Sequence, residues 1–164
     1  TFINIANHVE EFKNISLIIN TSAKLKNDYN FKVLLIGSGK DTDYYKELIK
    51  EFKLEDYIFI LGTKSNPYPY LKNSDCLLFT SKYEGYGLVL NEARVLGVPI
   101  ITSNCGASEE IVTKEYGNIF YKDSELGKLM ADFINKPNKK KTTFNYKEFN
   151  KIITDEFKNI IGKE

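Results

Sequence analysis

Residues 76–93, CLLFTSKYEGYGLVLNEA, place a short apolar run, two glycines and an amphipathic segment in that order. The run Cys76–Thr80 is typical of a strand buried on both faces, and Leu88–Leu96 has its apolar residues at helical spacing. Gly85 and Gly87 allow the tight turn that a strand-to-helix connection needs. The stretch therefore predicts a strand, turn and helix unit of the kind that builds a parallel sheet.

The same alternation of apolar runs and helical segments extends along the chain and predicts an α/β fold. We expect a single Rossmann-like domain with a doubly wound, mostly parallel sheet. Strands are predicted over Phe2–Ala6, Lys32–Gly37, Tyr57–Leu61, Cys76–Thr80, Pro99–Ser103 and Asn118–Tyr121. Helices are predicted over Asn14–Lys26, Tyr44–Phe52, Leu88–Leu96, Leu126–Ile134 and Tyr146–Ile161, the last preceded by a Lys139–Lys141 connection.

Ligands of a doubly wound sheet settle at the carboxyl ends of its strands, so the loops that follow the strands are the place to look for a site. These loops are Asn7–Lys13, Ser38–Asp43, Gly62–Asn66, Ser81–Gly87 and Asn104–Ser108.

Composition excludes several classes of function. The 164 residues suffice for one domain, and a formal net charge of +1 gives no global field to attract nucleic acid. No apolar run approaches the roughly 20 residues of a membrane span, and no targeting pattern is visible. Cys76 and Cys105 lack a second Cys or His at metal-ligand spacing. We therefore expect reduced thiols, no metal, no cofactor and a cytoplasmic protein.

The turn before the helix at Leu88 has the chemistry of a nucleotide-sugar site. Free N–H groups and the positive dipole end of that helix suit a diphosphate. Glu84 precedes the turn, and Glu92 lies about one turn into the helix. Carboxylates there would repel phosphate but accept hydrogen bonds from the hydroxyls of ribose and of a sugar ring.

Glu84 and Glu92 also form an E-x7-E pair within Glu-Gly-Tyr-Gly-Leu-Val-Leu-Asn-Glu-Ala. This pattern resembles the signature of retaining glycosyltransferases with the GT-B fold (glycosyl transferases group 1, family 4). The likeness covers roughly Ile3 to Tyr121 and includes, in order, Leu34–Gly39, Ile58–Gly62, Leu96–Ile101, Gly106 and Glu110–Val112.

The resemblance implies that residues 1–164 are the donor-binding C-terminal half of such an enzyme, with the N-terminal acceptor domain absent from this chain. The parent enzyme would transfer a sugar from a nucleoside diphosphate sugar to a carbohydrate or lipid-linked acceptor, with retention. Bacterial cell-surface polysaccharide or lipopolysaccharide synthesis is the expected setting, in the cytoplasm or at the inner face of the membrane by peripheral association. Residues 1–164 alone are expected to be inactive.

The resemblance also assigns roles to single residues. Glu84 is the implied catalytic residue, through contacts with hydroxyls of the donor sugar, and Glu92 would bind the ribose. Asn7 stands where the family usually has an arginine and brings no positive charge. The phosphates would be held by Lys13 and by backbone amides near Gly85, Tyr86, Gly87 and Leu88.

Other interpretations stay open. A non-catalytic module that binds a nucleotide or nucleotide sugar is the main alternative. A receiver-type domain would need an acidic cluster after the first strand, where Ala6-Asn7-His8 offers none.

Three smaller motifs have structural interpretations that we favour over functional ones. Asp41-Thr42-Asp43 matches a metal-binding D-x-D, but its place at a helix start favours capping. Tyr68 and Tyr70 can stack on a base or sugar, although packing of the loop and short helix before Cys76 is favoured. His8 is taken as incidental.

Overall fold

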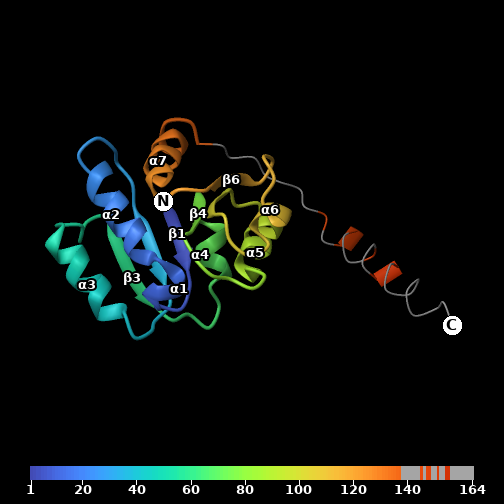
Figure 1. Ribbon diagram of the computed structural model, residues 1–164, viewed down its shortest axis with the longest axis horizontal. Coiled ribbons are helices and arrows are strands. Elements are labelled where there is room, and N and C mark those ends of the chain that lie inside the picture. Colours follow the sequence, from blue (N-terminus) through green and yellow to red (C-terminus); the bar gives the residue numbers. More distant parts are fainter. Residues whose placement is uncertain (138–144, 146, 149–150, 152–153, 156–164) are drawn as a thin grey trace.

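Six short apolar runs pair into one parallel sheet in the computed structural model, which describes residues 1–137, 145, 147–148, 151 and 154–155. Each predicted strand is present within one residue at either end, and the strand order is β3-β2-β1-β4-β5-β6 (Figure 1). All five strand pairings are parallel. The strands are β1 (Phe2–Ile5), β2 (Val33–Ile36), β3 (Ile58–Gly62), β4 (Cys76–Phe79), β5 (Ile100–Ser103) and β6 (Gly117–Phe120).

Helices form over the predicted segments that the structure describes, and further short helices are present. α5 has the predicted bounds, whereas the single-turn helices α1 and α6 were not predicted, because four residues show no period. The helix predicted over Tyr146–Ile161, with its Lys139–Lys141 connection, falls mainly outside the described residues. The helices are α1 (Glu10–Lys13), α2 (Ile15–Leu25), α3 (Thr42–Glu51), α4 (Tyr68–Lys72), α5 (Leu88–Leu96), α6 (Ser108–Ile111) and α7 (Leu126–Asn135).

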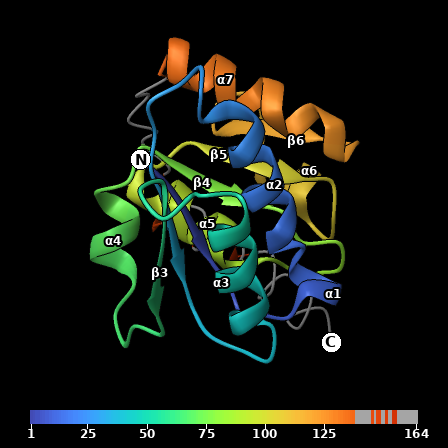
Figure 2. The ribbon, with the colours of Figure 1, turned by 90° about the vertical axis from the view of Figure 1, so that its left-hand side faces the viewer.

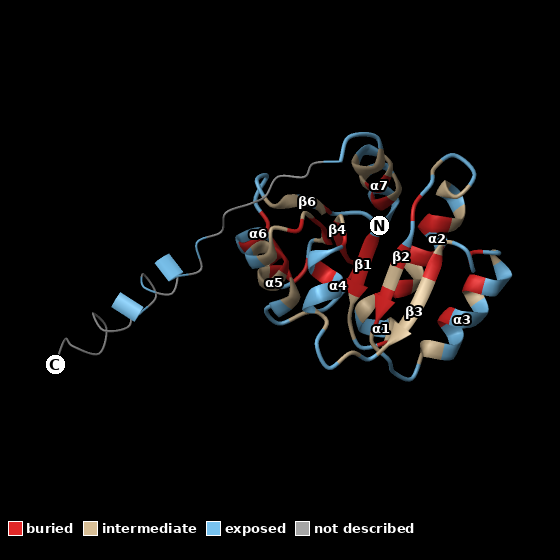
Figure 3. Cartoon of the chain, turned by 180° about the vertical axis from the view of Figure 1, so that it is seen from behind, coloured by how far each residue is buried: buried red, intermediate tan, exposed pale blue. Residues whose placement is uncertain are grey.

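Helices cover both faces of the sheet and create two hydrophobic cores. Neighbouring residues of β1 serve opposite faces: Phe2 belongs to the core under α2, α3 and α7, and Ile3 to the core under α4, α5 and α6. Figure 2 looks onto the first of these layers. The inner strands are buried, whereas the edge strands β3 and β6 are only partly so (Figure 3). This three-layer arrangement confirms the predicted doubly wound α/β fold. None of the described helices has the length and apolar character required to cross a bilayer.

The strand order creates a crevice between β1 and β4. The chain proceeds from β1 to β2 and β3 on one side of the sheet, and from β4 to β5 and β6 on the other. The loops after β1 and β4 therefore diverge, and a topological switch point of this kind is where doubly wound sheets bind ligands.

Close backbone packing fixes the loop after β1. Two backbone hydrogen bonds join it to the β2–α3 loop. The His8 amide donates to the Ser38 carbonyl oxygen at 3.0 Å, and the Asp41 amide donates to the His8 carbonyl oxygen at 3.1 Å. A Cβ atom on Gly39 would lie 2.4 Å from the His8 carbonyl oxygen. Gly37-Ser38-Gly39 thus forms a tight turn, and the absence of a Cβ atom at Gly37 and Gly39 lets the two loops touch.

Candidate functional site

Lys13 is positioned at the switch point by hydrogen bonds to the end of β4. The helix α1 ends at Lys13, and the left-handed backbone of its C-cap Asn14 (φ 49°) turns the chain directly into α2. The Thr80 hydroxyl donates to the Lys13 carbonyl oxygen at 2.9 Å, and the Lys82 amide donates to the Phe12 carbonyl oxygen at 2.8 Å. The side chain of Lys13 is therefore held over the loop that follows β4.

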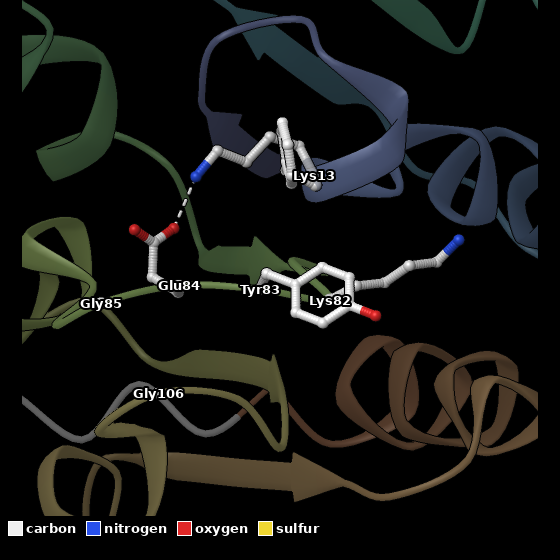
Figure 4. Close-up of a pocket in the computed structure, with 7 residues that line it drawn as sticks. Lys13, Lys82, Tyr83, Glu84, Gly85 and Gly106 are labelled. Carbon is white, nitrogen blue, oxygen red and sulfur yellow. Dashed lines mark hydrogen bonds and ion pairs between the residues drawn. The ribbon is translucent and has the colours of Figure 1, made fainter.

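Lys13 pairs with the first residue of the predicted motif. Its Nζ lies 2.5 Å from Oε2 of Glu84, and the two side chains are only 20% and 22% exposed (Figure 4). Partial shielding from water makes this pair stronger than a surface salt bridge. Two opposite charges from distant parts of the sequence thus meet where a ligand is expected.

A glycine from the next loop supports Glu84 from behind. Gly106 has a φ of +52°, and a Cβ atom there would lie 2.6 Å from the Glu84 carbonyl oxygen and 2.8 Å from that of Gly85. The Ser103 hydroxyl also donates to the Ser81 carbonyl oxygen at 2.6 Å. The loops after β4 and β5 are therefore packed backbone to backbone, which fixes the direction of the Glu84 side chain.

The loops after β1, β4 and β5 line an open pocket of about 460 Å³. Of the residues that the sequence marked as a site, it contains Lys13, Glu84 and Gly85. Sequence reasoning missed four others, although all lie in loops it had singled out: Phe12, Lys82, Tyr83 and Gly106.

Beside the pocket, α5 begins with uncapped amides. Its N-cap is Gly87 (φ 74°), which has no side chain to satisfy them, and only the Leu90 amide turns back, to Gly87 O at 2.9 Å. Tyr86 and Leu88 are exposed on either side of this residue. Free donors and a positive dipole end are the features that bind anions.

Five predicted site residues do not line this pocket: Tyr86, Gly87 and Leu88 at the start of α5, as well as Asn7 and Glu92. Asn7 is exposed in the loop after β1. Glu92 is half-buried on α5, where the Tyr68 hydroxyl donates to its Oε1 at 3.4 Å. Tyr68 and Tyr70 are both exposed, and Leu71 is the residue of α4 that is buried. The Tyr70 ring packs against the preceding loop, where Lys64 Nζ lies 5.7 Å from the ring centroid.

The acidic residues around α3 stabilise helix ends, although in a different way from the one predicted. Asp41 does not cap its own helix, because its Oδ2 accepts a hydrogen bond from the Glu10 amide at the start of α1, at 2.8 Å. Asp43 lies in the first turn of α3 and pairs with Lys46 at 2.8 Å. Within the described part of the chain, no group of three or more His, Cys, Asp or Glu is placed to hold a metal.

The resemblance assigns the phosphates to backbone amides and Lys13, so nucleotide binding, if this assignment holds, is expected to be independent of metal. EDTA should leave the affinity of this chain for a nucleoside diphosphate unchanged, because fixed N–H donors and Lys13 would hold the phosphates. Asp43→Ala should have the same lack of effect, as measured by isothermal titration calorimetry. A large loss of affinity in either experiment, with the fold intact by circular dichroism, would restore the D-x-D interpretation.

His8 is a buried part of the loop packing. Thr42 Oγ donates to Gly39 O at 2.9 Å, so His8 Nδ1, 2.9 Å from the same Oγ, is assigned as the donor of their hydrogen bond. Its Nε2 is buried and has no hydrogen-bond partner among the described residues, and burial lowers the pKa of His8 below its ordinary value of 6.5.

The burial of His8 predicts a loss of stability in mild acid. The unfolded chain takes up a proton below about pH 6.5 while the folded chain resists it, so stability is complete above that pH and falls as the pH drops towards the lowered pKa. His8 is the only histidine, so urea midpoints between pH 7 and 5.5 should report on it. His8→Asn, which keeps a donor near Thr42, should flatten this dependence, and an equal slope in both proteins would contradict the assignment.

Comparisons with known proteins identify the family of this chain. The family model "Glycosyl transferases group 1" matches residues 1–150, and the chain belongs to this family. A Campylobacter jejuni N-acetylgalactosamine-N,N'-diacetylbacillosaminyl-diphospho-undecaprenol 4-alpha-N-acetylgalactosaminyltransferase is 30% identical over 172 residues, covering 98% of this chain and 47% of that protein. The N-acetyl-alpha-D-glucosaminyl L-malate synthase of Bacillus anthracis is 32% identical over 117 residues, which cover 70% of this chain and 30% of that protein.

Solved structures show the same fold. The complex of Anabaena HepE with UDP superposes with a TM-score of 0.80 at 20% identity, covering 96% of this chain and 48% of that one. The chain spans about half or less of the length of the relatives it matches.

Proposed function

We propose that this chain is the donor-binding domain of a retaining GT-B glycosyltransferase, which transfers a sugar from a nucleoside diphosphate sugar to a carbohydrate or lipid-linked acceptor. The observation that carries the proposal is the Lys13–Glu84 pair beside the uncapped start of α5, at the switch point of the sheet. Cation, carboxylate and free amides at one place suit a ligand that joins a diphosphate to a hydroxyl-rich ring.

The proposed roles follow from the chemistry of the leaving group. Negative charge develops on the diphosphate as the glycosidic bond opens, and Lys13 with the amides near Gly85–Leu88 would stabilise it. Glu84 would accept hydrogen bonds from the donor sugar, and Glu92 from the ribose. Asn7 would add a hydrogen bond to the phosphate clamp without a charge.

The ion pair prepares the site before the donor arrives. An ammonium group has three donors, so Lys13 can keep its contact with Glu84 and still donate to a phosphate oxygen. Because both side chains are already held, little conformational freedom is lost on binding. The pair thus orients both groups towards one ligand.

The relatives suggest the acceptor. The Campylobacter jejuni relative is named for transfer to a diphospho-undecaprenol-linked sugar, which supports a lipid-linked acceptor for the parent enzyme. Synthesis of a bacterial cell-surface polysaccharide or lipopolysaccharide at the inner face of the membrane is the corresponding proposal for its role and location.

A nucleotide panel tests the proposal. The 164-residue chain should bind one of UDP, GDP and ADP in preference to the other two, weakly, because the ligand stays solvated on its open side. It should not transfer sugar, because we assign the acceptor contacts mainly to another domain. Calorimetry with the three nucleotides and a radiolabelled transfer assay provide the measurements. Failure to bind any of the three, or acceptor-dependent transfer by this chain alone, would contradict the proposal.

A further inference from the structure

Two aromatic rings form one wall of the pocket without belonging to either core. Tyr83 is 68% exposed and Phe12 is 44% exposed. Their ring centroids lie 6.5 Å apart at an interplanar angle of 78°, an edge-to-face contact. Neither ring is part of the hydrophobic cores under the helices. Packing in a hydrophobic core therefore does not explain why two aromatic side chains are exposed to solvent at this position.

The rings are held in place by the backbone. The Lys82 amide donates to the Phe12 carbonyl oxygen at 2.8 Å, so the residue before Tyr83 is tied to Phe12 itself. Phe and Tyr have only two side-chain torsions each, so ordering such a wall on ligand binding costs little entropy.

The wall lies on the far side of Glu84 from the start of α5. Figure 4 shows Tyr83 and Gly85 on opposite sides of Glu84, with the ion pair between them. If the donor diphosphate sits at α5 and the donor sugar at Glu84, the next ring along the pocket belongs to the second substrate. All these residues line the same 460 Å³ pocket.

The chemistry of the pocket suits a sugar ring. A pyranose has a face of C–H groups that packs on an aromatic ring and a rim of hydroxyls that hydrogen-bonds to charged groups. Phe12 and Tyr83 provide the first kind of surface, and Glu84 with Lys13 the second. We propose that Phe12 and Tyr83 form a stacking subsite for the pyranose ring of the acceptor, an inference that rests on the proposed transferase function.

The chain contains no tryptophan, which allows a direct test. Tyr83→Trp places the only tryptophan of the chain in the wall, where it can be excited selectively, and Tyr121→Trp places one of nearly equal exposure (66% for Tyr121) outside the pocket. The probes are methyl glycosides of glucose, galactose, N-acetylglucosamine and N-acetylgalactosamine, with and without saturating UDP. At least one glycoside should shift the Tyr83→Trp emission saturably, and none should shift that of Tyr121→Trp. Adding Phe12→Ala to Tyr83→Trp should weaken that binding by about 3- to 10-fold, with UDP affinity unchanged.

Each other outcome overturns the subsite. A response to UDP alone would assign the wall to the nucleotide, and a response to UDP-sugars but not to methyl glycosides would assign it to the donor ring. No saturable response to any glycoside, in a protein that still binds UDP by calorimetry, would mean that the wall takes no sugar. Loss of all nucleotide binding is a different result, because it contradicts the proposed function itself.

Discussion

Gly37→Ala is expected to lower the free energy of unfolding by about 3–5 kcal/mol, a large part of the 5–15 kcal/mol typical of a domain. Gly37 has a φ of +135°, a backbone conformation that L side chains rarely adopt. A Cβ atom there would also lie 1.8 Å from the Ala6 carbonyl oxygen. A change of side-chain rotamer cannot relieve this clash, because the backbone fixes the positions of both atoms. The loop after β1 would have to move away.

Gly62→Ala is the matched control for this substitution. Gly62 also has a positive φ, +69°, but nothing lies within 4 Å of its Cβ position, so only the backbone strain of about 1–2 kcal/mol applies. Urea denaturation followed by circular dichroism should separate the two variants clearly. Equal midpoints would show that the contact between Gly37 and Ala6 is relaxed in solution, and that the loop leading to Lys13 is not held as described.

The strands could be predicted because each is a short and nearly continuous apolar run. Such runs identify strands buried between two helical layers, and the structure places all six within one residue. Their order in the sheet was beyond the reach of this reasoning, since inner strands such as β1 and β4 carry the same pattern. The neighbourhood of Phe2 and Cys76, on which the switch point depends, is a contact between residues 74 positions apart.

Contacts between loops explain what was missed at the site. Glu84 and Lys13 were found through the glycine turn and the family resemblance. Their 2.5 Å contact joins two loops that are neighbours only because β1 and β4 are adjacent in the sheet. The same holds for Gly106, whose importance comes from its approach to the Glu84 backbone. Asp41 was placed at a helix start, but its partner is the amide of another helix, at Glu10.

Exchange of Lys13 and Glu92 for alanine should affect different parts of one ligand. A hydrogen bond to a charged group contributes about 1.5–3 kcal/mol, so Glu92→Ala should weaken binding of the preferred nucleoside diphosphate by roughly 10- to 150-fold. It should also abolish the preference for ribose over 2′,3′-dideoxyribose. Glu110→Ala, which removes an exposed carboxylate from α6, is the matched control and should change neither property.

Lys13→Ala should weaken binding at least as much, for a reason that the ion pair supplies. Its removal takes away an attraction to phosphate and leaves the Glu84 carboxylate unpaired beside the incoming negative charge. Preference for ribose should persist, the dependence of affinity on salt should become shallower, and Lys13→Ala combined with Glu84→Gln should recover part of the loss. Lys128→Ala, on exposed α7 surface, controls for the change in net charge. Calorimetry at two ionic strengths with the ribo- and dideoxyribonucleotides distinguishes the two residues, and a folded Glu92→Ala variant that still preferred ribose would remove α5 from the nucleotide site.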